Sequence, residues 1–190
     1  MVFSSNIFLF LFLPLTLFLY FLPFGKTYKN SLLLAASLIF YAWGEGDYLI
    51  LLMVSIVVNY FFGLRIEKSR NEIFIAIAFN LLLLGYYKYA NFFVENLPFE
   101  LDLQKVHLPI GISFFTFHAI SYLVDIYRKK CAAQRNIFDL ALYISFFPQL
   151  VAGPIVRYNF IQNYLKKRRH NWSFFAYGVR RFIIGLGKKF

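Results

Sequence analysis

The amino-acid sequence predicts an all-α fold: a polytopic transmembrane helical bundle with one re-entrant or broken segment and a cytoplasmic amphipathic helix. Of the 190 residues, 60% are hydrophobic and 15% are charged, whereas soluble domains average roughly 45–50% apolar and about 25% charged. The apolar residues form long runs, and the basic residues gather between them. Because a chain of this size has too little interior to hide so much apolar surface, the composition excludes disorder, a coiled coil and an ordinary soluble enzyme.

Five runs have the composition of membrane spans, which need about 20 mostly apolar residues. We expect these spans at residues 2–24, 31–44, 48–64, 73–93 and 109–127. The first has no charge, no basic start and no cleavage site, so we interpret it as a retained anchor kinked at Pro14. The second is short and ends at the interface anchors Tyr41 and Trp43. Lys88 snorkels near the end of the fourth, and Pro109 suits a first helical position in the fifth.

The charges of the loops predict the orientation of the bundle. With the N-terminus outside, the inner loops are 25–30, 65–72 and 128–136, which carry nine basic residues against two acidic ones. The outer loops, 44–47 and 94–106, carry one Lys against five acidic residues. An excess of Lys and Arg marks cytoplasmic loops, so we expect the N-terminus on the external side.

Residues 137–156 break this alternation. A full span there would put Arg157 and the basic run 166–169 outside, against the same rule. Pro148 and the Gly153–Pro154 pair interrupt the segment, and its proline-free part, 137–147, would be a helix of only about 16 Å. We therefore expect a re-entrant or broken segment that enters from the cytoplasm and returns. Such backbone survives at membrane depth only when it is buried in protein or lines a wet cavity.

The last segment, residues 172–190, places apolar residues at spacings of three and four with basic residues among them. This pattern predicts an amphipathic helix. It lies flat on the inner leaflet or packs against the broken segment.

The fifth predicted span contains ionisable residues, which are costly in lipid and are therefore functional candidates. His118, Ser121, Tyr122 and Asp125 share one helical face at spacings of three and four. In one interpretation this face borders a water-lined path and takes part in chemistry. In the other it is structural: Asp125 pairs with Arg128, and His118 hydrogen-bonds a neighbouring helix.

Polar residues elsewhere also leave alternatives open. Gln149 and Arg157 flank the glycine–proline turn, and Arg157 either binds the phosphate or carboxylate of an entering donor or anchors at a lipid headgroup. Asn59 and Asn80 lie in mid-span, where an interhelical hydrogen bond is the expected role. The one cysteine, Cys131, is interpreted as a free thiol that faces the cytosol.

Missing motifs exclude several chemistries. The sequence contains no cysteine pair for zinc, no histidine box of a di-iron membrane enzyme, and no HExxH, Walker A, GxSxG or GxGxxG motif. We therefore expect no metal site and no bound cofactor. The net charge of +11 is explained by membrane orientation and anionic headgroups, so no nucleic-acid partner is expected.

Two stretches resemble a known family. They are HLPIGISFFTFHAISYLVDIYR at residues 107–128 and YISFFPQLVAGPIVRY at residues 143–158. Both are similar to the membrane-bound O-acyltransferase family, specifically to its bacterial alginate O-acetyltransferase subunit group. SLIFYAWG at 37–44 and VVNYFFG at 57–63 are similar to the same group. The resemblance covers essentially the whole chain.

The resemblance implies an integral acyltransferase of the bacterial inner membrane. Such a protein takes an acetyl group from a cytoplasmic donor, acetyl-CoA or another acyl donor, and moves it through a tunnel. A periplasmic acetyltransferase partner then serves a polysaccharide acceptor such as alginate. The candidates for the tunnel wall or the donor site are His118, Ser121, Asp125, Gln149 and Arg157. The alternatives are transfer of D-alanyl or another acyl group to a cell-wall polymer, and a transporter or channel component.

One departure from the family concerns catalysis. The near-invariant catalytic His of the family lies C-terminal of the stretches quoted above, beyond residue 190. None of His107, His118 and His170 matches its position, so no catalytic residue is assigned. We expect the chain to be the N-terminal portion of one acyltransferase domain, inactive by itself.

Overall fold

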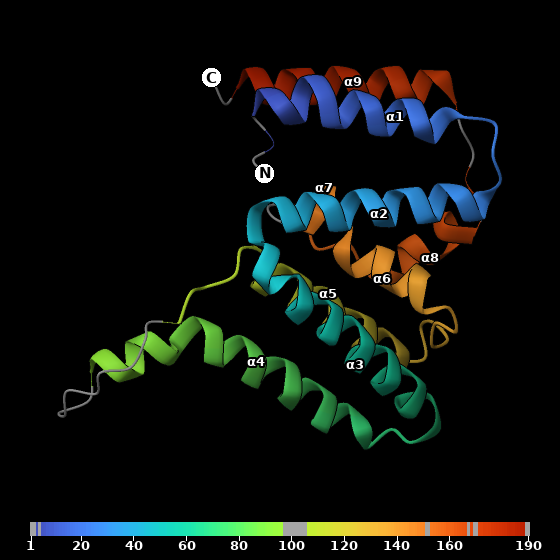
Figure 1. Ribbon diagram of the computed structural model, residues 1–190. Helices are drawn as coiled ribbons and strands as arrows, with labels where there is room; N and C mark the ends of the chain where they lie inside the picture. Colours follow the sequence, from blue (N-terminus) through green and yellow to red (C-terminus); the bar gives the residue numbers. More distant parts are fainter. Residues whose placement is uncertain are drawn as a thin grey trace.

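The molecule is a stack of helices (Figure 1). The computed structural model describes residues 3, 5–96, 106–150, 153–166, 168 and 171–188, and these contain no strand. The predicted all-α class is therefore confirmed. In chain order the elements are the π-helical turn η1 (Phe8–Phe12), α1 (Leu13–Phe21), α2 (Lys26–Glu45), the 3-10 turn η2 (Gly46–Tyr48), α3 (Leu49–Lys68), α4 (Glu72–Glu95), α5 (Ile112–Tyr127), α6 (Ile137–Ser145), α7 (Phe147–Leu150), α8 (Tyr158–Lys166) and α9 (Trp172–Gly187).

Two helical stretches are long and apolar enough to cross a membrane. They are residues 26–68, in which η2 joins α2 to α3, and α4. The stretch Phe8–Phe21 and α5 are shorter apolar helices. A helix of 20 residues such as α3 is about 30 Å long, which equals the hydrocarbon thickness of a typical bilayer. These helices fit a membrane protein.

Several predicted boundaries differ from the structure, three of them for a clear physical reason. The second helix begins at Lys26 rather than 31, since its polar first residues form an exposed first turn after the extended Gly25. The first helix ends at Phe21 because Pro23 forces Leu22 into an extended conformation, with ψ 146°. Pro109 is not the first residue of the fifth helix. Its carbonyl accepts a turn hydrogen bond from Ile112 N (3.2 Å), and α5 starts only there.

The helices lie in layers, with α5 near the centre. In Figure 1, α1 and α9 run antiparallel as one layer, α2 follows with α6–α8 on its other side, and α3, α5 and α4 complete the stack. Phe21 holds the outer pair together, with its ring 6.0 Å from that of Trp172 and 5.3 Å from that of Phe175. Helix α5 contacts α3, α4, α6 and α8, so its side chains supply much of the core.

The pairing of α3 with α4 depends on two buried amides. Asn59 Nδ2 donates to Asn80 Oδ1 (3.1 Å), and Asn80 Nδ2 donates to Asn59 Oδ1 (2.7 Å). Both side chains are fully buried. The predicted interhelical hydrogen bond is therefore confirmed. Both helices also pack against α5, where Gly63 makes room for Tyr122, because a Cβ at residue 63 would lie 2.6 Å from the Tyr122 hydroxyl.

The loops rich in basic residues gather at one end of the stack. Arg70 donates to the Tyr127 carbonyl (3.1 Å), Glu67 accepts from Ala133 N (3.2 Å), and Asn30 donates to Asp139 (2.9 Å). At the other end, His107 lies 3.4 Å from Glu45. The helices thus bring the predicted inner loops to one end, which we call the basic end. Of the charges predicted for the outer loops, Glu100, Asp102 and Lys105 lie outside the described residues.

Candidate functional site

The segment after α5 is an interrupted helix, and side chains meet two of the backbone groups that the break leaves free. Helix α6 ends at Ser145, and α7 starts at Phe147, because Pro148 has no N–H to donate and its ring clashes with the preceding turn. Phe147 N donates to the Ser37 hydroxyl on α2 (3.2 Å). Gln149 Nε2 donates to the Tyr143 carbonyl (2.8 Å). Interrupted backbone needs such partners at membrane depth.

The chain turns back sharply after α7. A Cβ at residue 153 would collide with the backbone of Gln149, so the reversal requires glycine there. The Tyr143 hydroxyl then donates to the Val156 carbonyl (2.8 Å), which holds the returning backbone beside α6. Val151 and Ala152 lie outside the described residues.

Helix α5 lies directly against this interrupted segment. Gly111, at its start, has φ +81°, and a Cβ there would lie 2.8 Å from the Leu150 carbonyl oxygen. Glycine adopts this left-handed conformation without strain. The N-terminus of α5 can therefore approach the end of α7 closely, and the polar face of α5 meets α6.

Three of the five predicted site residues come together around Tyr143. The His118 ring packs edge-on against the Tyr143 ring at 5.6 Å. Ser121 lies at the Tyr143 phenol, and the Asp125 carboxylate is within electrostatic range of it. His118 is fully buried and Asp125 is 3% exposed. Three polar atoms have no hydrogen-bond partner of good geometry among the described residues: both ring nitrogens of His118 and Oδ2 of Asp125. The one group close to the His118 ring is the backbone of Phe114, one turn earlier on the same helix.

The structural contacts expected for this face do not form. Within the described residues, no ion pair joins Asp125 to Arg128, which is exposed, and His118 donates no hydrogen bond to a neighbouring helix. Buried polar atoms are rarely left unmet. The unpaired atoms of His118 and Asp125 therefore mark a place where the bundle has polar capacity that the described chain does not use.

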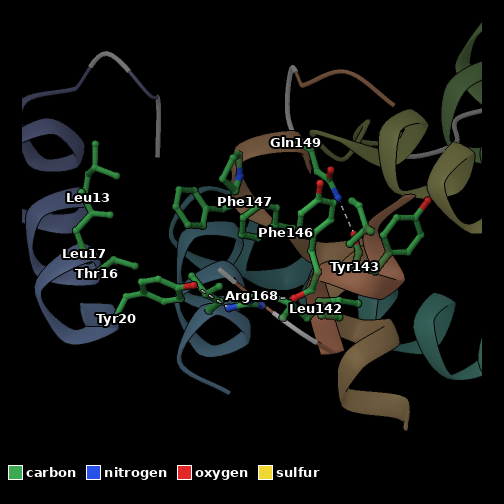
Figure 2. Close-up of a pocket in the computed structure, with 15 residues that line it drawn as sticks. Leu13, Thr16, Leu17, Tyr20, Leu142, Tyr143, Phe146, Phe147, Gln149 and Arg168 are labelled. Carbon is green, nitrogen blue, oxygen red and sulfur yellow. Dashed lines mark hydrogen bonds between the residues drawn. The ribbon is translucent and has the colours of Figure 1, made fainter. Parts of the chain in front are cut away.

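The fourth predicted residue, Gln149, lines a cavity of about 500 Å³ (Figure 2). The cavity lies between α1, α2, the α6–α7 break and α8. Its wall is mostly apolar and is formed by Leu13, Thr16, Leu17, Tyr20, Leu33, Leu142, Tyr143, Phe146, Phe147, Pro148, Gln149, Ile161, Tyr164, Leu165 and Arg168. Figure 2 shows α1 on one side of the space and the break, with Gln149 and Phe147, on the other.

The fifth predicted residue, Arg157, is exposed and does not line this cavity. Arg168 does. Its guanidinium donates to Asn30 Oδ1 (2.7 Å), to the Tyr164 carbonyl (3.2 Å) and to the Tyr20 hydroxyl (3.3 Å). Sequence reasoning missed Arg168 because it belongs to the run of basic residues at 166–169. Only its tertiary contacts distinguish it from the other Lys and Arg residues of that run. Lys167, Arg169 and His170 lie outside the described residues.

A cluster of tyrosines also escaped the sequence analysis. The rings of Tyr122 and Tyr143 lie 5.0 Å and 5.1 Å from that of Tyr158, and all three side chains are buried. Gln134 ties two of them to the basic end, since its backbone N–H donates to the Tyr122 hydroxyl (3.0 Å) and its Nε2 to that of Tyr158 (2.9 Å). The signal was present, because all three lie in the stretches that carry the family resemblance.

Metal chemistry finds no ligand set in the described part of the chain. No three His, Cys, Asp or Glu residues gather there closely enough to hold an ion.

Comparison with known proteins finds relatives along the entire chain. It is 43% identical over 206 residues to the "Probable alginate O-acetylase AlgI" of Pseudomonas aeruginosa, covering 100% of this chain and 39% of that protein. It is likewise 43% identical to the protein of that name in Azotobacter vinelandii, covering 41% of it. A "Peptidoglycan O-acetyltransferase" of Helicobacter pylori is 34% identical over 231 residues. That match covers 100% of this chain and 44% of the Helicobacter protein.

These matches have one common property. The chain spans about two fifths of the length of the curated relatives, and it matches their N-terminal part. No protein-family model matches the chain, and no solved structure matches it either.

Proposed function

Because the chain is related over its whole length to alginate O-acetylases of the membrane-bound O-acyltransferase family, we propose that it acts in transferring acetyl groups to an extracytoplasmic polysaccharide such as alginate. The observation that carries the proposal is the 41–43% identity to proteins of that name over 100% of the chain. The structure supports it, since the two stretches with the family resemblance become α5 and the broken segment, which lie side by side.

The proposed role of this chain is to form part of the wall along which the acetyl group passes. His118 and Asp125 offer unmet hydrogen-bonding atoms in a largely apolar core. In a site of low dielectric such atoms bind a polar group more strongly than water-exposed ones. Ser121 and Gln149 extend the polar set around Tyr143, and none of these residues is assigned a bond-making role.

The proposed direction of transfer is from the cytoplasm outward. The basic end of the stack is the side that the positive-inside rule assigns to the cytoplasm, which supports a bacterial inner-membrane protein with its N-terminus outside. The donor would be acetyl-CoA or another acyl donor that arrives at the basic end. A periplasmic acetyltransferase partner and the polysaccharide acceptor would act at the opposite end.

A second acceptor is favoured by one relative. The Helicobacter protein is named a peptidoglycan O-acetyltransferase and is 34% identical to this chain. A cell-wall polymer is therefore the alternative acceptor, although the identity to the alginate O-acetylases is higher.

Deleting the gene and measuring ester-linked acetate in both polymers tests the proposal. We expect exopolysaccharide acetylation to be lost and to return when the gene is supplied again. If acetate were lost from peptidoglycan alone, the acceptor would be the cell-wall polymer and not the exopolysaccharide. Unchanged acetate in both polymers, with the protein present in the parent strain, would contradict both versions.

Complementation with point variants tests the wall. Asp125→Asn keeps the side-chain shape and replaces the carboxyl group with an amide, so we expect exopolysaccharide acetate to fall several-fold at equal protein levels in the membrane. Asp47→Asn is the matched control, because Asp47 is exposed in η2. Full acetylation by Asp125→Asn would remove Asp125 from the proposed path.

A further inference from the structure

Helix α1 has a hollow on each side of it. One is the cavity of Figure 2, of about 500 Å³, between α1 and the α2/α6–α8 layer. The other is a hollow of about 720 Å³ between α1, α7 and α9, lined by Phe3, Phe8, Leu13, Leu17, Phe147, Pro148, Phe174, Phe175, Gly178, Val179 and Phe182. The two share Leu13, Leu17, Phe147 and Pro148. We call them together the α1 slot.

The α1 slot is polar at one end and aromatic at the other. Tyr20, Asn30 and Arg168 meet at the first end, which is the basic end because Asn30 also contacts Asp139. At the far end Phe8, Phe40 and Phe147 pack with ring centroids 5.6–6.2 Å apart. An apolar space of this kind does not hold water stably, so its natural occupant is an amphiphile.

In the described part of the chain no carboxylate binds the Arg168 guanidinium directly, and Asp139 lies one hydrogen bond further away, on Asn30. The partners of the Arg168 guanidinium are all neutral: an amide oxygen, a carbonyl and a phenol. Lys29 lies beside the same Tyr20 ring, with its Nζ 5.3 Å from the ring centroid. Arginine binds phosphate through charge-assisted, often bidentate hydrogen bonds. The polar end is therefore complementary to an anionic headgroup.

We propose that the α1 slot binds one anionic phospholipid of the inner leaflet. Its phosphate lies on Arg168 near Lys29, and one acyl chain fills the hollow on each side of Leu17. Both hollow volumes lie within the roughly 300–1,000 Å³ of ordinary ligand pockets. The anionic lipids of the cytoplasmic leaflet attract basic protein segments at the membrane surface. In the proposed topology the basic end faces that leaflet, so the headgroup would meet Arg168 there.

The test is native mass spectrometry of the protein purified in mild detergent and supplied with phosphatidylglycerol and phosphatidylethanolamine in equal amounts. We expect one phosphatidylglycerol per chain, with at least tenfold preference over phosphatidylethanolamine. Arg168→Gln should abolish that preference. Arg157→Gln should keep it, since Arg157 is exposed and does not line the slot.

A second pair of variants guards against misfolding of Arg168→Gln. Leu17→Trp fills the slot and should remove the bound lipid. Leu15→Trp should leave the lipid in place, because the Leu15 side chain is 51% exposed and does not line the slot. Three outcomes would each overturn the proposal. Both lipids are retained equally, or Leu17→Trp leaves the lipid occupancy unchanged, or the wild-type protein binds no lipid because another polypeptide segment fills the slot.

Discussion

Two pairs of buried polar residues show how differently single side chains behave in this bundle. Asn59 and Asn80 satisfy each other through two reciprocal hydrogen bonds, which is the normal way in which a membrane bundle uses mid-span amides. His118 and Asp125 are as deeply buried but leave three polar atoms unmet among the described residues. The first pair is thus explained by folding alone. The second leaves hydrogen-bonding atoms that the proposed acetyl path would use.

Cys131 offers a prediction about pH at the residue scale. It is half-buried at the basic end, and burial, with smaller contributions from Asp125 and Glu67, raises the pKa of its thiol to about 12. Only the thiolate is nucleophilic. The uncharged thiol therefore persists at neutral pH, and alkylation by iodoacetamide should be slow and should accelerate roughly tenfold per pH unit up to pH 10. A rate that levels off below pH 9, as in the denatured control, would contradict this environment.

At the scale of elements, the close approach of α5 to α7 depends on one glycine. Gly111 combines a left-handed backbone with a neighbouring carbonyl at the place where a Cβ would stand. The contact joins the start of the polar helix to the end of the interrupted one. The positions of His118 and Tyr143 relative to each other therefore follow from this junction.

Gly111→Ala should destabilise the protein by about 1–3 kcal/mol, because a non-glycine residue is strained in this conformation. The measurement is thermal unfolding of the detergent-purified protein. Gly85→Ala is the control, since Gly85 lies inside α4 with open space where its Cβ would be, and alanine favours a helix interior. Equal melting temperatures for both variants would show that the junction carries no strain.

At the scale of the whole molecule, the helices sort the loops by charge. Contacts such as Arg70 with Tyr127, Glu67 with Ala133 and Asn30 with Arg168 gather segments far apart in the sequence at the basic end. Figure 1 shows the turn between α2 and α3 at the opposite end. A stack arranged in this way presents one strongly basic end, which is the arrangement that fixes orientation in a membrane.

Cysteine labelling tests that orientation. In a Cys131→Ala background, we expect Asp47→Cys to react with a membrane-impermeant maleimide in intact spheroplasts, because the proposed topology puts η2 at the external end. Arg157→Cys should react only after permeabilisation. Both native side chains are exposed, so access to the reagent, and not burial, decides the result. External labelling of Arg157→Cys would invert or break the proposed topology.

Composition and local pattern alone determined the helical class and the charge asymmetry of the loops, and they indicated helices apolar enough for lipid, because each of these depends only on neighbouring residues. They also indicated the polar face of α5 and the residues that interrupt the chain at Pro148 and Gly153–Pro154. Only the tertiary structure decided that Tyr143 is the side chain around which that face gathers, and that Arg168 rather than Arg157 lines the cavity. The reason is distance along the chain: Arg168 is selected by Asn30, 138 residues away, and no local pattern records such a contact.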